Sequence, residues 1–126
     1  MSVIFITGAN RGIGLSLTQQ YLKGNHKVYA TYREATSAEA LLSLAKNNIN
    51  MTCIQLEITD YQTMGQLPWQ MEPIEILINN AGYYGPKGYG LGNTDTSASG
   101  LIKVIKSANT ELSGHFFNFD GSEIDW

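Results

Sequence analysis

The fold of this chain is decided by the stretch Val3-Ile4-Phe5-Ile6-Thr7-Gly8-Ala9-Asn10-Arg11-Gly12-Ile13-Gly14. It opens with an almost unbroken β-branched and aromatic run, which is typical of a strand buried on both faces of a parallel sheet. Apolar residues then recur at every fourth position, at Ile13, Leu17 and Tyr21, and Gly24-Asn25 follows as a stop signal. The sequence therefore predicts a strand, a glycine turn and a helix in succession.

The alternation of strand and helix continues beyond this unit. The further predicted elements are a strand over residues 28–32, a helix opened by a capping box of Thr36 and Glu39, a strand over 51–58, a short helix capped by Asp60 and cut off by Pro68, and a strand over 74–78. Because strands and helices alternate, we expect an α/β fold with a Rossmann-type, doubly wound parallel sheet.

A glycine-rich stretch follows Gly82. Residues 83–98 combine glycines, Pro86 and small polar side chains, a composition that predicts a loop. From about Ser99 apolar residues return at helical spacing, and residues 115–119 are typical of a last strand. We expect one domain over residues 1–126, with a core at 1–82, a loop at 83–98 and a C-terminal helix and strand at 99–126. The sheet should have about five strands.

Composition narrows the classes of function. The formal net charge of −3, from 8 basic and 11 acidic side chains, leaves no basic surplus for a nucleic acid partner. Cys53 is the single cysteine and lies in an apolar run, so it should be a small buried hydrophobe in a reducing compartment. No segment approaches the roughly 20 apolar residues of a membrane span. We expect a soluble, cytoplasmic protein.

The glycine turn has the chemistry of a phosphate-binding loop. Gly8 permits the tight turn, Gly12 lets backbone come close to a pyrophosphate, and Gly14 lets helix and strand pack together. The following helix N-terminus offers free N–H groups and the positive end of the helix dipole. The alternative is a purely structural turn, since any sharp strand-to-helix connection uses glycine.

Two motifs in their expected places resemble the short-chain dehydrogenase/reductase family. The glycine turn has the family's T-G-x-x-x-G-x-G spacing, and Asn79-Asn80-Ala81-Gly82 follows the fourth predicted strand, where family members carry N-N-A-G. Residues 114–126 are similar to the end of the carbonyl-reductase-like branch that includes the C-factor and sniffer proteins. The resemblance covers residues 1–95 and 99–126 and implies a nicotinamide dinucleotide cofactor.

The end of the second strand bears on the choice of cofactor. No carboxylate directly follows Tyr32, while Arg33 and Arg11 could meet a 2′-phosphate, so we expect NADP(H) in preference to NAD(H). The alternative is that both arginines are ordinary solvated charges, and Glu34 is a neighbouring acid. The family places an aspartate after the third strand to hold the adenine amino group, where this chain has Glu57. The expected cofactor-binding residues are Gly8, Asn10, Arg11, Gly12, Ile13, Gly14, Tyr32, Arg33, Glu57, Ile58, Asn80, Ala81 and Gly82.

The resemblance also implies a catalytic serine, tyrosine and lysine, and none of them is assigned here. The one Tyr-x-x-x-Lys match is Tyr83-Tyr84-Gly85-Pro86-Lys87. Gly85-Pro86 removes the helix that would place positions i and i+4 on one face, and the candidate serines Ser97 and Ser99 come after it. Too few residues remain for two further helix–strand units. We therefore expect an internal deletion near Asp95 that removes the family's catalytic helix and strand.

Such a deletion would leave the fourth strand with a free edge. Either residues 116–119 pair beside residues 74–78, or two chains form a homodimer through the edge or by strand exchange. His26 and His115 have no acidic or cysteine cluster around them in the sequence, so no metal site is expected. Trp126 should act as a tail anchor.

Three hypotheses on function follow. The chain is an NADP-binding protein with little or no activity. Alternatively, it is a carbonyl reductase that uses an unusual acid, such as Tyr83, Tyr84 or Tyr89, or a group from a partner subunit. As a third possibility, it is a vestigial deletion product.

Overall fold

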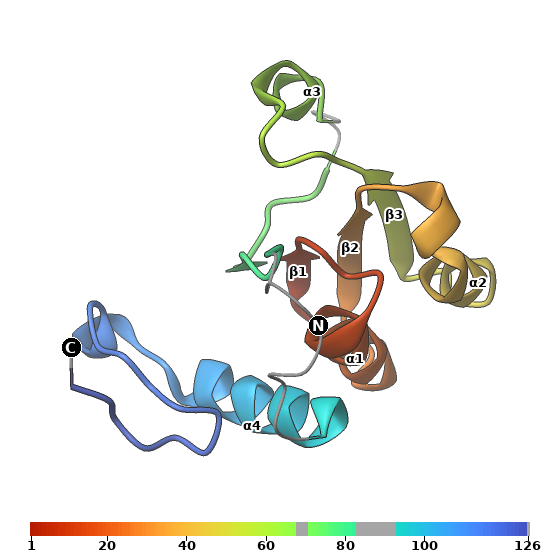
Figure 1. Cartoon of the computed structure of the whole chain (residues 1–126). Helices are drawn as coiled ribbons and strands as arrows, with labels where there is room; N and C mark the ends of the chain where they lie inside the picture. Colours follow the sequence, from red (N-terminus) through yellow and green to blue (C-terminus); the bar gives the residue numbers. More distant parts are fainter. Residues whose placement is uncertain (68–70, 83–92, 126) are drawn as a thin grey trace.

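A computed structural model describes residues 1–67, 71–82 and 93–125 of the chain (Figure 1). The expected helix stop at Pro68, the Tyr83–Lys87 match with most of the glycine-rich stretch, and the anchor Trp126 lie outside the described residues. The elements are β1 (Val3–Ile6), α1 (Gly12–Lys23), β2 (Lys27–Tyr32), η1 (Ala35–Ser37), α2 (Glu39–Lys46), β3 (Met51–Gln55), α3 (Tyr61–Gly65), β4 (Ile76–Ile78), α4 (Thr94–Ser107) and η2 (Thr110–Leu112).

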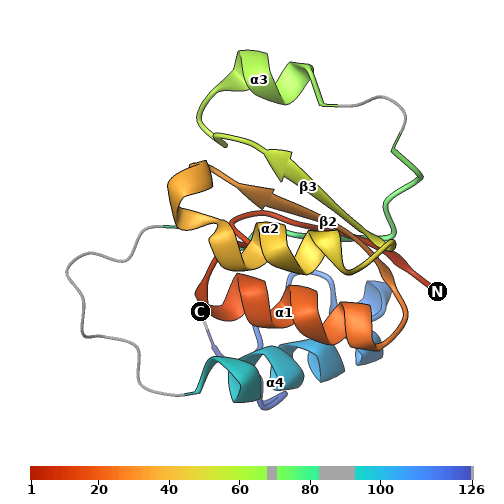
Figure 2. The same cartoon turned by 90° about the vertical axis from the view of Figure 1, so that its right-hand side faces the viewer.

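The described strands form one parallel sheet of order β3-β2-β1-β4. This Rossmann-like order confirms the predicted fold class, and the described residues supply four strands where about five were expected. In Figure 2, α1, α2 and α4 lie on one side of the sheet and α3 on the other. Because all strands run the same way, their carboxyl ends meet at one edge, where ligands bind in open α/β sheets.

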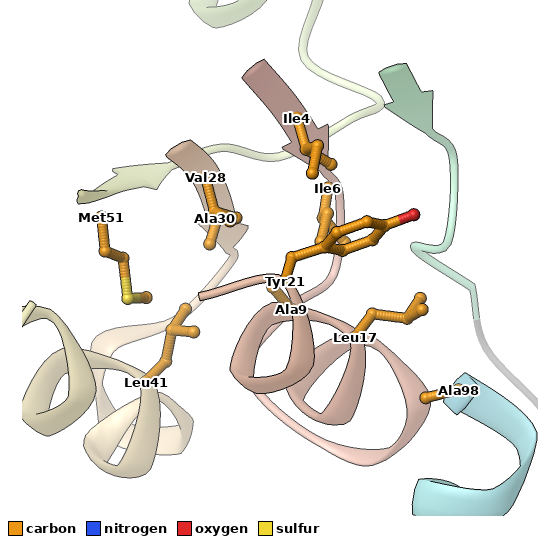
Figure 3. Packing of buried hydrophobic residues seen from close by; sticks show 10 residues of the cluster. All are labelled: Ile4, Ile6, Ala9, Leu17, Tyr21, Val28, Ala30, Leu41, Met51 and Ala98. Carbon is orange, nitrogen blue, oxygen red and sulfur yellow. The ribbon is translucent and has the colours of Figure 1, made fainter. Parts of the chain in front are cut away.

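The two faces of the sheet have separate hydrophobic clusters. The larger cluster joins strand residues such as Ile4, Ile6 and Val28 to Leu17 of α1 and Leu41 of α2 (Figure 3). On the opposite face, Val3, Phe5, Tyr29 and Leu56 form a smaller cluster, with Leu67 and Met71 packed against it. All four residues of β1 are buried, as expected for a strand covered on both faces.

Helix α4 lies along α1 and is held there by polar side chains. Ser16 of α1 donates from its hydroxyl to Asp95 Oδ1, and Gln20 Nε2 donates to the Asp95 backbone carbonyl at 3.1 Å. Ser99 in turn donates to Gln20 Oε1 at 2.8 Å, and Ala98 is fully buried in the core between the two helices. The helix after the glycine-rich stretch is therefore anchored to the helix that follows the glycine turn.

Two helix starts differ from the sequence expectation. The prediction of a capping box formed by Thr36 and Glu39 is wrong, because Thr36 lies in the preceding 3₁₀ turn. The N-cap of α2 is Ala38, which has no side-chain cap hydrogen bond. The loop expected to reach residue 98 ends earlier, since Asn93 accepts from the backbone N–H groups of Asp95 and Thr96 and starts α4 at Thr94.

The cap of the short helix α3 is confirmed. Asp60 accepts hydrogen bonds from the Thr63 hydroxyl and from the backbone N–H groups of Thr63 and Gln62. These donors stabilise the carboxylate and hold the pKa of Asp60 below its usual value. Helix α3 ends at Gly65, and β3 ends at Gln55, three residues before the expected strand end.

The expected last strand is not a strand of the sheet. Residues 115–119 make a single antiparallel bridge, between Phe117 and Glu123, within a local hairpin. Among the described residues, β4 pairs with β1 alone, so the expectation that residues 116–119 lie beside β4 is wrong. The physical reason is that the hairpin pairs residues only a few positions apart, which costs less loop-closure entropy than pairing with a distant strand.

No helix among the described residues has the length and apolar character needed to cross a membrane. Cys53 is half-buried on β3, where its thiol lies 3.8 Å from the Leu41 carbonyl oxygen, and burial raises its pKa. The cysteine thus packs among apolar neighbours, although it is less buried than expected.

Candidate functional site

The glycine turn between β1 and α1 has the tight geometry that its sequence demands. Gly8 has a φ of +62° and lies so close to the Asn80 segment that a Cβ there would be 2.7 Å from Ala81 Cα. A Cβ on Gly14 would run into the carbonyl oxygen of Gly8 and would lie 2.5 Å from Asn80 Nδ2. Glycine at these two positions therefore permits the close packing of turn, helix and the segment after β4.

Gly12 differs from these two glycines because its surroundings are open. It has a φ of +56°, and no described atom lies within 4 Å of the position that a Cβ would take. Arg11 is the N-cap of α1, and its side chain makes no cap hydrogen bond. The first turn of α1 contains no acidic residue. A helix N-terminus of this kind, with open space beside it, fits the phosphates of a dinucleotide.

Asn80 joins the glycine turn to the segment after β4. Its Nδ2 group donates to the carbonyl oxygens of Thr7 at 3.1 Å and Gly8 at 2.9 Å. In return, the Thr7 hydroxyl accepts from the backbone N–H groups of Asn80 and Ala81, both at 3.0 Å. These reciprocal hydrogen bonds hold Asn80, the second asparagine of the N-N-A-G segment, beside the glycine turn.

The other side of the turn is held by β2. Gly8 N–H donates to the Thr31 hydroxyl at 3.2 Å, and Ala9 N–H donates to the Thr31 carbonyl at 2.8 Å. Asn10 reaches further and donates from Nδ2 to the carbonyl of Ser37 at 3.1 Å. Thr7, Thr31 and Ser37 were missing from the expected site residues. Thr7 directly precedes Gly8 in the motif, whereas nothing local in the sequence singles out Thr31 or Ser37.

A charged corner lies at the carboxyl ends of β2 and β3. Arg33 follows β2, and its Nε lies 3.8 Å from a carboxylate oxygen of Glu34 and 3.8 Å from one of Glu57. The Arg33 backbone carbonyl accepts a hydrogen bond from Gln55 Nε2 at 3.1 Å, which ties the ends of the two strands together. The structure thus brings together Arg33 and Glu57, which are 24 positions apart in the sequence.

The remaining expected residues surround these two groups. Ile13 and Tyr32 are half-buried and pack against the larger core cluster, Ala81 is half-buried beside Gly8, and Arg11, Ile58 and Gly82 are exposed. A surface hollow lined by residues of α4 and by Phe119, Asp120 and Gly121 includes none of the expected site residues. Within residues 1–67, 71–82 and 93–125, no three His, Cys, Asp or Glu side chains form a candidate metal site.

Comparison with known proteins identifies related sequences. A family model described as short chain dehydrogenase matches residues 2–116. The NADP-dependent 3-hydroxy acid dehydrogenase YdfG of Salmonella typhi is 31% identical over 84 residues, which are 64% of this chain and 33% of that protein. The 3-oxoacyl-[acyl-carrier-protein] reductase MabA of Mycobacterium avium is 29% identical over 83 residues, 63% of this chain and 29% of that protein. The chain spans about a third of the length of these curated relatives.

Solved structures share the same fold over more of the chain. A carbonyl reductase from Pseudomonas aeruginosa PAO1 in complex with NADP has a TM-score of 0.60 and 25% identity, over 84% of this chain and 52% of its own. The carbonyl reductase Sniffer of D. melanogaster has a TM-score of 0.61 and 25% identity, over 83% of this chain and 48% of its own.

Proposed function

The chain belongs to the short-chain dehydrogenase family, and from this premise we propose that it binds NADP(H) at the glycine turn. The observation that carries the proposal is Gly12, where no other side chain or segment of the described residues lies within 4 Å of the Cβ position, while Asn80 and Thr31 hold the turn in shape. The backbone N–H groups of the first turn of α1, which includes Ile13 and Gly14, would bind the pyrophosphate. When bound, the nicotinamide would supply or accept hydride.

The preference for NADP(H) rests on Arg33 and on the relatives. Arg33 comes directly after β2, the position where an acid selects a free ribose hydroxyl and a base selects a 2′-phosphate. The relative YdfG is named as NADP-dependent, and a similar carbonyl reductase was solved with NADP. Arg11, Tyr32, Ile58 and Gly82 complete the proposed binding residues, together with Asn10, Ala81 and Glu57.

We further propose that the chain has little or no carbonyl reductase activity. It aligns with the Pseudomonas reductase over 84% of its own length but only 52% of that chain, as expected if an internal segment near Asp95 is missing. The proposed loss removes the acid that protonates the carbonyl, a step commonly worth about 10² to 10⁴ in rate. The alternatives are an active reductase that uses Tyr83, Tyr84, Tyr89 or a partner's group, and a vestigial product.

Calorimetric titration with NADPH and with NADH tests the proposed binding. We expect saturable binding of NADPH, weaker binding of NADH, and a loss of at least about tenfold in NADPH affinity in Gly12→Ala, because a Cβ would enter the phosphate space. Gly114→Ala is the matched control, since Gly114 also has a positive φ, +84°, and no neighbouring group of the described residues within 4 Å of a Cβ, but lies in the C-terminal segment. Absence of saturable binding in the wild-type chain would refute the proposal.

Turnover separates the alternatives. We expect no NADPH oxidation with small aldehydes or quinones above the rate of the free cofactor. Measurable turnover that disappears in Tyr83→Phe, Tyr84→Phe or Tyr89→Phe would support the active alternative instead. A chain that neither binds cofactor nor unfolds cooperatively would support the vestigial one.

We also propose that the chain forms a homodimer through the open edge of the sheet or by strand exchange. Leu77 lies on β4, which among the described residues pairs with β1 alone, and is 60% exposed. An unpaired edge with an exposed apolar side chain favours pairing with another chain. Size-exclusion chromatography with light scattering should give the dimer mass for the wild-type chain and the monomer mass for Leu77→Lys; a wild-type monomer at all concentrations would exclude the dimer.

A further inference from the structure

Arg33 is shared between two carboxylates. Its Nε atom lies 3.8 Å from Glu34 Oε1 and equally far from Glu57 Oε2. Glu34 is the next residue along the chain, whereas Glu57 arrives from the end of β3. The charge that would meet a 2′-phosphate is therefore partly balanced before any cofactor binds.

Glu57 is the better anchored of the two acids. Its Oε1 atom accepts from the Thr59 backbone N–H at 3.3 Å and from the Thr59 hydroxyl at 3.1 Å, which leaves Oε2 toward Arg33. The side chain of Glu57 is 37% exposed, compared with 64% for Glu34. An anchored and less solvated carboxylate exerts a stronger field on its neighbours than a free surface side chain does.

The two oxygens of Glu57 face different partners. Oε1 accepts two hydrogen bonds from Thr59, whereas Oε2 faces Arg33 at 3.8 Å and accepts no hydrogen bond among the described residues. A carboxylate oxygen has two lone pairs, so Oε2 can still accept from an adenine amino group. The contacts therefore point to an action of Glu57 on Arg33 in addition to the proposed contact with adenine.

We propose that Glu57 is a specificity-determining residue that lowers the preference of this chain for NADP(H) over NAD(H). The inference rests on the proposed NADP(H)-binding function. A phosphate monoester carries a charge of about −1.5 to −2 at neutral pH, so a fixed carboxylate beside Arg33 both occupies the guanidinium and repels the phosphate. The free 2′-hydroxyl of NAD(H) carries no charge and is unaffected by this repulsion.

The test is Glu57→Gln, which removes the negative charge and keeps an acceptor oxygen for adenine. We expect NADPH affinity to rise by roughly three- to tenfold and NADH affinity to stay within about twofold, because only the phosphate feels the lost charge. The gain should shrink as salt is raised from about 0.02 to 0.5 M, since screening weakens exposed charge pairs. Calorimetry measures both dissociation constants without turnover.

Two controls accompany this variant. Glu34→Gln removes a charge at the same distance from Arg33 but without the Thr59 anchor, so its gain in NADPH affinity should be smaller. Glu111→Gln removes one negative charge in the C-terminal 3₁₀ turn and should change neither cofactor's affinity.

The outcomes distinguish this inference from the function on which it rests. A wild-type chain that binds neither cofactor overturns both. If the wild-type chain binds, then an unchanged ratio of affinities in Glu57→Gln overturns the inference alone. A parallel loss of NADPH and NADH affinity in Glu57→Gln also overturns it, because that result indicates that Glu57 acts by binding adenine. If Glu34→Gln gains as much NADPH affinity as Glu57→Gln, the assignment to Glu57 is overturned.

Discussion

The glycine turn and the C-terminal segment, residues 108–125, contrast in how they are held. At the turn, Asn80 and Thr31 bind three backbone groups of residues 7 and 8, and there is no room for a Cβ at Gly8 or Gly14. No residue of the C-terminal segment is buried, and its bridge joins Phe117 to Glu123 within the segment itself. A change of the same kind should therefore destabilise the whole fold at the turn and only a local part of it at the C-terminus.

Gly14→Ala should have the largest effect. Its Cβ would meet the Gly8 carbonyl oxygen and Asn80 Nδ2, two groups fixed by hydrogen bonds, so we expect the free energy of unfolding to fall by about 3 kcal/mol. Urea denaturation measures this change. Gly65→Ala, at a helical position where no neighbouring group of the described residues lies within 4 Å of the new Cβ, is the control and should change stability little. A Gly14→Ala chain as stable as wild type would show that the turn adapts freely.

Asn80→Ala comes next. It removes both side-chain donors from the carbonyl groups of Thr7 and Gly8, so we expect a loss of about 2 kcal/mol in the free energy of unfolding, because half-buried carbonyls lose their partners. Asn79→Ala, a change at the exposed neighbour, should have a much smaller effect. Equal effects of the two substitutions would contradict a special role for Asn80 in holding the turn.

Gly100→Ala sharpens the comparison directly. Gly100 lies in α4, and a Cβ there would overlap the Phe119 carbonyl oxygen as severely as the Gly14 Cβ overlaps its neighbours. Because the C-terminal segment is exposed and can move away, and because alanine favours the helix, we expect a loss of only about 1 kcal/mol. Hydrogen exchange should rise in residues 108–125 and not at the glycine turn. A global increase in exchange would erase the distinction between the two regions.

Tyr21→Phe should have the smallest effect. Tyr21 is 5% exposed, burial raises its pKa, and its hydroxyl has no hydrogen-bond partner among the described residues. Removing an unpaired buried hydroxyl should change the free energy of unfolding by about 0 to +1 kcal/mol, in the stabilising direction. Thermal unfolding of the variant measures the change; a clear destabilisation would reveal a partner for this hydroxyl.

Much of the fold could be predicted because its signals are local. The apolar run of β1, the four-residue spacing of Ile13, Leu17 and Tyr21, and the cap at Asp60 each act within a few residues. The start of α4 was missed because Asn93 caps a first turn rich in small polar residues, which resembles a loop by composition. The capping box at Thr36 failed because the chain first makes a 3₁₀ turn there.

The end of the chain shows the limit of pattern recognition for strands. Residues 115–119 have the composition of a strand, but composition does not determine which segment of the chain they pair with. Gly121, with a φ of +88°, turns the chain back so that Ile124 N–H donates to the Phe116 carbonyl at 2.7 Å. This nearby partner satisfies the backbone at a lower entropic cost than the edge of β4.

By itself, the sequence determined the strand–glycine turn–helix unit and the parallel sheet, because glycine conformations and hydrophobic periods act locally. Only the tertiary structure decided that Thr31 of β2 and Asn80 of the segment after β4 hold the turn, that α4 lies along α1, and that Glu57 reaches Arg33. These contacts join residues more than 20 positions apart. They exist because parallel strands bring their carboxyl ends to one edge of the sheet, an arrangement that no local pattern specifies.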